Sequence, residues 1–241
     1  MYLEFVTMDE LKKWVKKKPV VIIPFGSVEE HGTHLPLSTD TYQILEVLKI
    51  VEKERNVFIA PPVHYGVCRS TEQHSGTVSI SPNTLRMLVY DILSALKKQG
   101  FKIMLLISGH AGKLHMFSIL EACEMFQKSV GGGVRLFVYS ELELLGNDAL
   151  QIIETPYDSH AGEIETSRML VINEKLVKKN WKNIKADKPY FFEGEIVKDK
   201  LKYWKSGVWG DPSKASKEKG RKLIELSARK IIEILDKITL P

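Results

Sequence analysis

Residues 101–108 read FKIMLLIS, an almost unbroken apolar run that leads directly into the polar turn SGHAG at residues 108–112. Runs of this kind suit strands that are buried on both faces of a parallel sheet. Residues 20–25 (VVIIPF), 57–60 (VFIA) and 134–140 (VRLFVYS) have a similar character. Four such segments predict a sheet in the interior of the protein.

The segments between these strands carry the periodicity of helices. Ser81 and Pro82 form a favourable N-cap and first turn, and apolar residues then recur at helical spacing as far as Gly100. We expect three more helices, over residues 39–53, 113–128 and 214–237. This alternation predicts an α/β fold, in which residues 1–241 form a single domain: a three-layer α/β/α sandwich with a mostly parallel central sheet.

Composition narrows the class of protein. The 241 residues are 44% hydrophobic and 27% charged, which is ordinary for a globular chain with a substantial core. The formal charge of +5 is mild and the basic residues are scattered, so we expect no nucleic-acid partner. Cys68 and Cys123 form no CxxC pair, the N-terminus has no signal-peptide pattern, and no run is long enough to span a membrane. We expect a cytoplasmic protein with no membrane partner.

A cluster of carboxylates and imidazoles follows the first predicted strand, where open α/β sheets bind ligands. Residues 26–40 read GSVEEHGTHLPLSTD. Glu29 and His31 point the same way in an extended segment, and Asp40 opens the next helix, from which it can fold back. These residue types are ligands for a catalytic divalent metal such as Zn²⁺ or Mn²⁺. The alternative is a polar loop, with Asp40 or Thr39 as an N-cap.

Two further clusters lie later in the chain. His110 stands between two glycines where the clearest strand ends, and it is either an additional ligand or a structural histidine. Residues 158–167 read DSHAGEIETS. In this segment Glu163 is a candidate to close a metal site, and His160 is a candidate general acid or base, because imidazole titrates near neutral pH. The alternative is a capping arrangement with Glu165 at the start of a helix.

Taken together, these motifs resemble the creatininase family of metal-dependent amidohydrolases. The resemblance rests, in order, on FGSVEEHGTHLPLSTD (25–40), SGH (108–110), HAGEIETS (160–167) and GVWGDPSKASKEKG (207–220). It implies two divalent metal ions per subunit, Zn, Mn or Fe, with Asp40 bridging them and Glu29, His31 and His110 as further ligands. It also implies a homo-oligomer, commonly a hexamer.

The sequence departs from creatininase at three positions. Gly112 stands where creatininase has a ligating glutamate, and we expect Glu163 to take over that role. Ala111 and Pro156 stand where creatininase places aromatic side chains around creatinine. We therefore do not expect creatinine to be the physiological substrate.

The resemblance also suggests roles outside the ligand set. It assigns proton transfer to His160. The loop at residues 72–77 (EQHSGT) resembles a family loop near the active site, so His74 is a candidate for contact with substrate or with a metal-bound water. A hydrogen-bonded loop histidine is the alternative. Ser108 and Gly109 are further candidates for substrate binding.

The expected activity is hydrolysis of a non-peptide amide C–N bond, linear or cyclic, in a small-molecule substrate, through water activated by two metal ions. Two alternatives lie within the family: a deformylase acting on a formamidopyrimidine nucleotide of archaeal flavin and deazaflavin biosynthesis, and a peptide-trimming enzyme acting on a redox-cofactor precursor. The alternative from another class is a non-catalytic metal-binding protein on the same scaffold.

Overall fold

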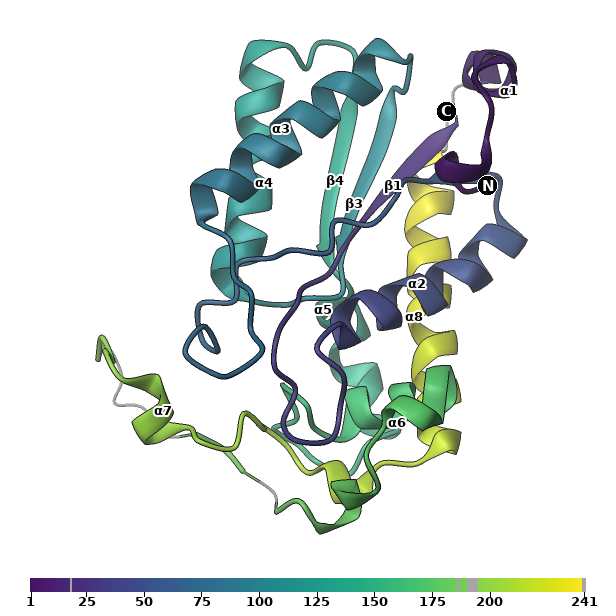
Figure 1. Ribbon diagram of the computed structural model, residues 1–241. Helices are drawn as coiled ribbons and strands as arrows, with labels where there is room; N and C mark the ends of the chain where they lie inside the picture. The colour runs from purple at the N-terminus through teal and green to yellow at the C-terminus, as the bar shows by residue number, and fades with distance from the viewer. Residues whose placement is uncertain (18, 186, 190–194, 240–241) are drawn as a thin grey trace.

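The computed structural model, which describes residues 1–17, 19–185, 187–189 and 195–239, has a parallel sheet between two layers of helices (Figure 1). The sheet order is β2-β1-β3-β4, and all three pairings are parallel. The strands are β1 (Val20–Phe25), β2 (Val57–Ile59), β3 (Ile103–Ser108) and β4 (Arg135–Ser140). The predicted α/β sandwich is confirmed, and each strand lies within the segment predicted for it.

The helices include every one that the sequence predicts. They are α1 (Met8–Trp14), α2 (Thr39–Glu54), α3 (Pro82–Lys98), α4 (Lys113–Ser129), α5 (Glu141–Leu145), α6 (Glu163–Asn173), α7 (Lys200–Tyr203) and α8 (Lys217–Thr239). Short 3-10 helices lie at Leu3–Phe5, Val15–Lys17, Gly146–Gln151, Glu174–Leu176, Lys179–Asn183 and Pro212–Lys214. The last of these explains why α8 begins after the predicted start at residue 214. Among the helices that the structure describes, none combines the length and apolar character needed to cross a bilayer.

The two faces of the sheet are covered by different helices, as Figure 1 shows for the pair α3 and α4 and the pair α2 and α8. Val21 and Ile23 of β1 belong to the core cluster that includes α3 and α4. Val20 and Ile22 belong to the cluster that includes α2 and α8. Successive side chains of a strand point to opposite faces, so a strand covered on both sides is apolar throughout.

The register of β1 and β3 brings two loops together. Phe25 and Ser108, the last residues of these neighbouring strands, are paired. Directly after Ser108, a Cβ on Gly109 would lie 2.3 Å from the carbonyl oxygen of Asp40. Only glycine allows the end of β3 to approach the first turn of α2 so closely. The loop after β3 and the helix after β1 therefore meet at one edge of the sheet.

A buried arginine fixes the first half of α6. The side chain of Arg168 forms two hydrogen bonds of 2.8 Å with the carboxylate of Glu141 in α5. It also donates to Ser227 Oγ of α8 at 2.6 Å and to Gln43 Oε1 of α2 at 3.3 Å. Gln43 in turn donates to Glu165, which precedes Arg168 in α6. This network ties the direction of the Glu165 side chain to three other helices.

We predict that Glu141→Gln strongly destabilises the protein. The side chains of Arg168 and Glu141 are 0% and 1% exposed, so the substitution leaves a buried guanidinium without its counter-charge. The free energy of unfolding should fall by about 3–5 kcal/mol, measured by denaturant titration. Glu143→Gln, an exposed change in the same helix, should stay within about 0.5 kcal/mol of the parent. Equal effects of the two changes would contradict this account.

Candidate metal centre

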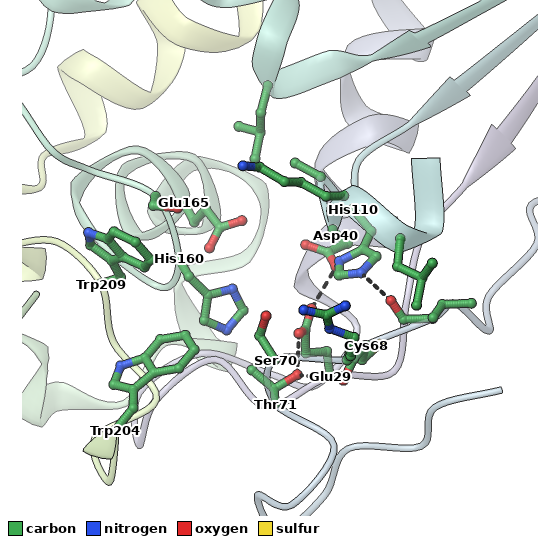
Figure 2. A pocket seen from close by; sticks show the side chains of 18 residues that line it. Glu29, Asp40, Cys68, Ser70, Thr71, His110, His160, Glu165, Trp204 and Trp209 are labelled. Atoms are coloured by element: carbon green, nitrogen blue, oxygen red, sulfur yellow. Dashed lines mark hydrogen bonds and ion pairs between the residues drawn. The ribbon is translucent and has the colours of Figure 1, made fainter. Parts of the chain in front are cut away.

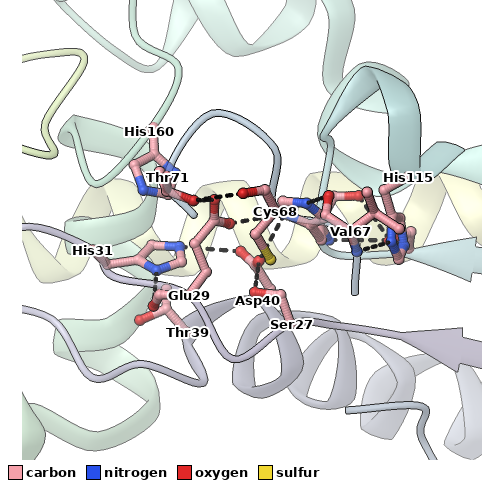
Figure 3. Close-up of polar contacts among 12 residues, drawn as sticks. Ser27, Glu29, His31, Thr39, Asp40, Val67, Cys68, Thr71, His115 and His160 are labelled. Atoms are coloured by element: carbon pink, nitrogen blue, oxygen red, sulfur yellow. Dashed lines mark hydrogen bonds and ion pairs between the residues drawn. The ribbon is translucent and has the colours of Figure 1, made fainter. Parts of the chain in front are cut away.

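Four side chains that the sequence singles out meet at the edge of the sheet beyond β1 and β3, as Figure 3 shows in part. Asp40 lies at their centre. Its Oδ1 is 3.1 Å from His31 Nε2, and its Oδ2 is 3.1 Å from His110 Nδ1. Glu29 Oε2 is 3.0 Å from the same nitrogen of His110. The structure therefore brings Glu29, His31, Asp40 and His110 together, and Asp40 turns one oxygen toward each imidazole.

The backbone sets which nitrogen of each imidazole faces the carboxylates. His31 Nδ1 donates to the carbonyl oxygen of Glu29 at 3.0 Å. His110 Nε2 donates to the carbonyl oxygen of Val67 at 3.1 Å. In the neutral rings the other nitrogens, which face the carboxylates, therefore carry lone pairs. A lone pair directed at a carboxylate oxygen is repelled unless a proton or a cation lies between the two atoms. Metal-binding histidines are oriented in the same way, by a hydrogen bond from the ring nitrogen opposite the metal.

The centre concentrates negative charge. Within the described parts of the chain, no lysine or arginine forms an ion pair with the buried carboxylates of Glu29, Asp40 and Glu165. Burial alone would lower the pKa of His31 and His110, yet the facing carboxylates raise both pKa values well above the usual range. Buried charge requires a partner or a metal. The donor set therefore fits divalent cations.

Glu165, rather than Glu163, completes the cluster. Glu165 Oε2 lies 3.5 Å from His31 Nε2. The carboxylate of Glu163 accepts from the backbone N–H of Thr155 at 2.8 Å and pairs with Lys219 of α8 at 2.5 Å. The expectation for Glu163 is corrected for a geometric reason: residues two apart in a helix point in nearly opposite directions, so only one of the pair can face the cluster.

The donor atoms fall into three overlapping groups, within each of which they lie no more than 4.8 Å apart. These groups are Glu29, Cys68 and His110; Glu29, His31 and His160; and His31, Asp40 and Glu165. Cys68 belongs to one of them, although the sequence offered no metal-type spacing to mark it. Asp40 links the first and third groups, because its Oδ2 faces His110 and its Oδ1 faces His31.

His160 lies at the rim of the centre. Its ring is 4.3 Å from that of His31, centroid to centroid, and its Nε2 donates to the carbonyl oxygen of Glu30 at 2.8 Å. Two backbone hydrogen bonds with Trp209, of 3.0 and 2.8 Å, hold the residue in place. Burial and the neighbouring His31 would lower the pKa of His160, but Glu29 and Glu30 outweigh them and raise it. The ring is therefore suited to carrying a proton beside the cluster.

A cavity of about 500 Å³ opens over the centre (Figure 2). Trp204 and Trp209 line it on the side of His160, and Arg69 and Lys113 also line it. Such a volume suits a small-molecule ligand. The sequence did not reveal either tryptophan as a cavity residue, although Trp209 lies inside the GVWGD motif.

Three predicted substrate-binding residues do not line this cavity but support groups that do. Ser108 Oγ accepts from the backbone N–H of His110 at 3.1 Å and donates to its carbonyl oxygen at 2.7 Å. Gly109 packs against the backbone of Asp40. His74 Nε2 donates to the carbonyl oxygen of Trp204 at 2.7 Å. The hydrogen-bonded alternative for His74 thus agrees with the structure.

A carboxylate–imidazole cluster beyond the strands of an α/β sheet, below a cavity, is typical of metal-dependent hydrolases. The chain belongs to the creatininase family: residues 4–235 match that family, which is described as creatinine amidohydrolase. A mycofactocin precursor peptide peptidase of Mycolicibacterium smegmatis is 30% identical over 85% of this chain and 79% of its own. A creatinine amidohydrolase of Pseudomonas putida is 26% identical over 90% and 88%.

Solved structures agree on the fold. A crystal structure of creatinine amidohydrolase superposes with a TM-score of 0.90 at 22% identity, over 100% of this chain and 98% of the other. Similar structures are described as a manganese creatininase and as a Zn–Zn type. At this level of identity the likeness establishes the fold, and the family membership rests on the sequence match.

We predict that two neighbouring glutamates respond differently to the same substitution. Glu165→Gln removes a charge that faces His31, so the protein should bind less zinc after dialysis, measured by inductively coupled plasma mass spectrometry. Glu163→Gln loses an ion pair outside the cluster, so its zinc content should match that of the parent even if its stability falls. Loss of zinc in Glu163→Gln alone would contradict the assignment.

Proposed function

We propose that this protein is an amidohydrolase that cleaves a non-peptide amide C–N bond, linear or cyclic, with the help of two divalent cations. One observation carries the proposal. Asp40 presents one oxygen to the group around His31 and the other to the group around His110. A carboxylate placed in this way suits a bridge between two cations, and paired cations are common in hydrolytic sites.

The residues fall into two sets around that bridge. Glu29, Asp40 and His110 would hold one cation, and His31, Asp40 and Glu165 would hold the other. Cations held in these places would supply an ionised water at neutral pH and would polarise the carbonyl of the substrate. Zn²⁺, Mn²⁺ and Fe²⁺ are all compatible with carboxylate and imidazole donors.

The chain itself supplies proton transfer and substrate orientation. The hydrogen bond from His160 Nε2 to Glu30 fixes the ring, which leaves Nδ1 to exchange a proton with the substrate. A protonated imidazole in this place suits delivery of that proton to the leaving nitrogen. Trp204 and Trp209 offer flat apolar surfaces that suit a planar substrate and exclude water beside it.

The named relatives differ in what they act on, one being a peptide peptidase and another a creatinine amidohydrolase. Membership of the family therefore leaves the substrate open. Ala111 lines the cavity where creatininase places an aromatic side chain, which argues against creatinine. The expected cytoplasmic location and hexameric assembly also stay predictions, and light scattering after size-exclusion chromatography checks the latter.

A second candidate function is favoured by two positively charged side chains that line the cavity. Arg69 and Lys113 are exposed side chains, and no carboxylate in the described structure forms an ion pair with either. Together with the two tryptophans they suit a substrate with a planar ring and an anionic tail, such as a formamidopyrimidine nucleotide. On this reading the enzyme is a deformylase, and the bond cleaved is still a non-peptide amide.

We predict that His160→Ala separates turnover from metal binding. Loss of a positioned acid or base typically lowers turnover by about 10²–10⁴-fold, whereas the cluster keeps its other donors. Zinc content should be unchanged, while steady-state hydrolysis of the best substrate from a panel of formamides, lactams and short peptides should fall. Glu29→Gln should lose metal and activity together. Full activity in His160→Ala would remove its assigned role, and bound metal with no turnover across the panel would favour a non-catalytic protein.

We predict that Lys113→Ala distinguishes the second candidate from the first. A charge-assisted hydrogen bond contributes about 1.5–3 kcal/mol, so KM for a formamide bearing a phosphate should rise by about 10–100-fold. KM for the same formamide without phosphate should stay constant. The control is Lys128→Ala, an exposed change at the far end of the same helix. Equal KM changes for the two substrates would count against an anionic substrate.

A further inference from the structure

The sulfur of Cys68 lies beside the Glu29 side of the centre, as Figure 3 shows. Donor atoms of Glu29, Cys68 and His110 all lie within 4.8 Å of one another. Cys68 is 1% exposed and lines the cavity. It comes from the loop after β2, on a different segment from the other two donors. Three segments thus place a carboxylate, a thiol and an imidazole around one point.

An independent observation on Glu29 indicates that this point takes a ligand. Glu29 is 3% exposed, and its Oε1 accepts a hydrogen bond from Thr71 Oγ1. Its Oε2 is buried and has no hydrogen-bond partner within the described residues. That oxygen faces His110 Nδ1 at 3.0 Å, and in the neutral ring this nitrogen carries the lone pair because Nε2–H donates to Val67. A buried carboxylate oxygen left in this way is costly unless a cation satisfies it.

The Glu29 side of the centre has room for a further donor. Glu29, His110 and one oxygen of Asp40 make three protein donors, and a zinc ion that also binds a water can expand to five ligands. Gly112, on the same loop as His110, has no side chain to offer. Cys68 approaches from the loop after β2 and is the nearby donor that remains.

We propose that Cys68 is a cation ligand on the Glu29 side of the centre, an inference that rests on the proposed metal site. Binding exchanges the S–H bond for a metal–sulfur bond, and the proton passes to solvent without any change of oxidation state. Thiolate is a soft ligand, whereas Mn²⁺ and Mg²⁺ prefer oxygen. This half of the centre therefore favours a cation of intermediate softness, such as Zn²⁺, Fe²⁺ or Co²⁺.

Cys123 provides a matched control. It is also a free, buried cysteine, but it packs in α4 within the apolar cluster between that helix and the sheet. In the described structure it belongs to no group of potential metal donors. A serine at either position changes one sulfur to one oxygen, and only the change at position 68 alters the proposed ligand set.

Cobalt substitution tests the proposal by a readout that is independent of activity. The full-length protein, stripped with chelator and titrated with Co²⁺, should show a thiolate-to-cobalt charge-transfer band in the near ultraviolet. Cys123→Ser should keep that band, and Cys68→Ser should lose it while keeping the visible ligand-field bands of bound cobalt. A parent that binds cobalt without the band, or a band that survives in Cys68→Ser, would overturn the role of Cys68 alone. A parent that binds no cobalt would overturn the metal centre itself.

Two further measurements keep the proposal testable if Cys68→Ser folds poorly. X-ray absorption of the zinc-loaded parent should show one sulfur at about 2.3 Å, and a shell of only nitrogen and oxygen would exclude the ligand. Where the variant folds, its affinity for Zn²⁺ should fall by at least about tenfold, since even partners outside the ligand shell contribute that much. Its affinity for Mn²⁺ should change less, and equal losses for both metals would contradict a sulfur ligand.

Discussion

The structure depends on one electrostatic constraint: Glu29, Asp40 and Glu165 are buried together around two imidazoles, and within the described residues neither lysine nor arginine neutralises them. Carboxylates so placed are tolerated only where positive charge is delivered to them. The paired ends of β1 and β3, the glycine at position 109 and the docking of α6 all serve to bring these groups within reach of one another. The fold thus creates a cluster whose donors fit divalent cations.

Sequence reasoning recovered the features that follow from local pattern. Apolar runs predicted the strands because both faces of the sheet are covered, and capping and periodicity predicted α2, α3 and α4 closely. It also located Glu29, His31, Asp40 and His110, because ligand-binding loops of an open sheet follow strands that lie side by side. The resemblance to the creatininase family added a bridging role for Asp40, which stays a prediction, and the two oxygens of Asp40 face His31 and His110.

The features of the site that the sequence did not predict depend on contacts between distant segments. Glu163 and Glu165 are equivalent in local sequence, and what separates them is that Lys219 of α8 pairs with one while Gln43 of α2 contacts the other. Trp204 lies beside His160 because its carbonyl oxygen is held by His74. Cys68 had no motif of its own, and only the path of the loop after β2 brings its sulfur to Glu29. Periodicity carries no information on such packing.

The order of the donors along the chain has a consequence for folding. Glu29 lies near the N-terminus and Glu165 in the second half, and both belong to the cluster around Asp40. A cation held by His31, Asp40 and Glu165 would join segments that are far apart in the unfolded ensemble, so it would act as a reversible cross-link that closes a long loop. Metal binding is then thermodynamically coupled to tertiary folding. Chelators should accordingly loosen the packing of α6 as well as empty the centre.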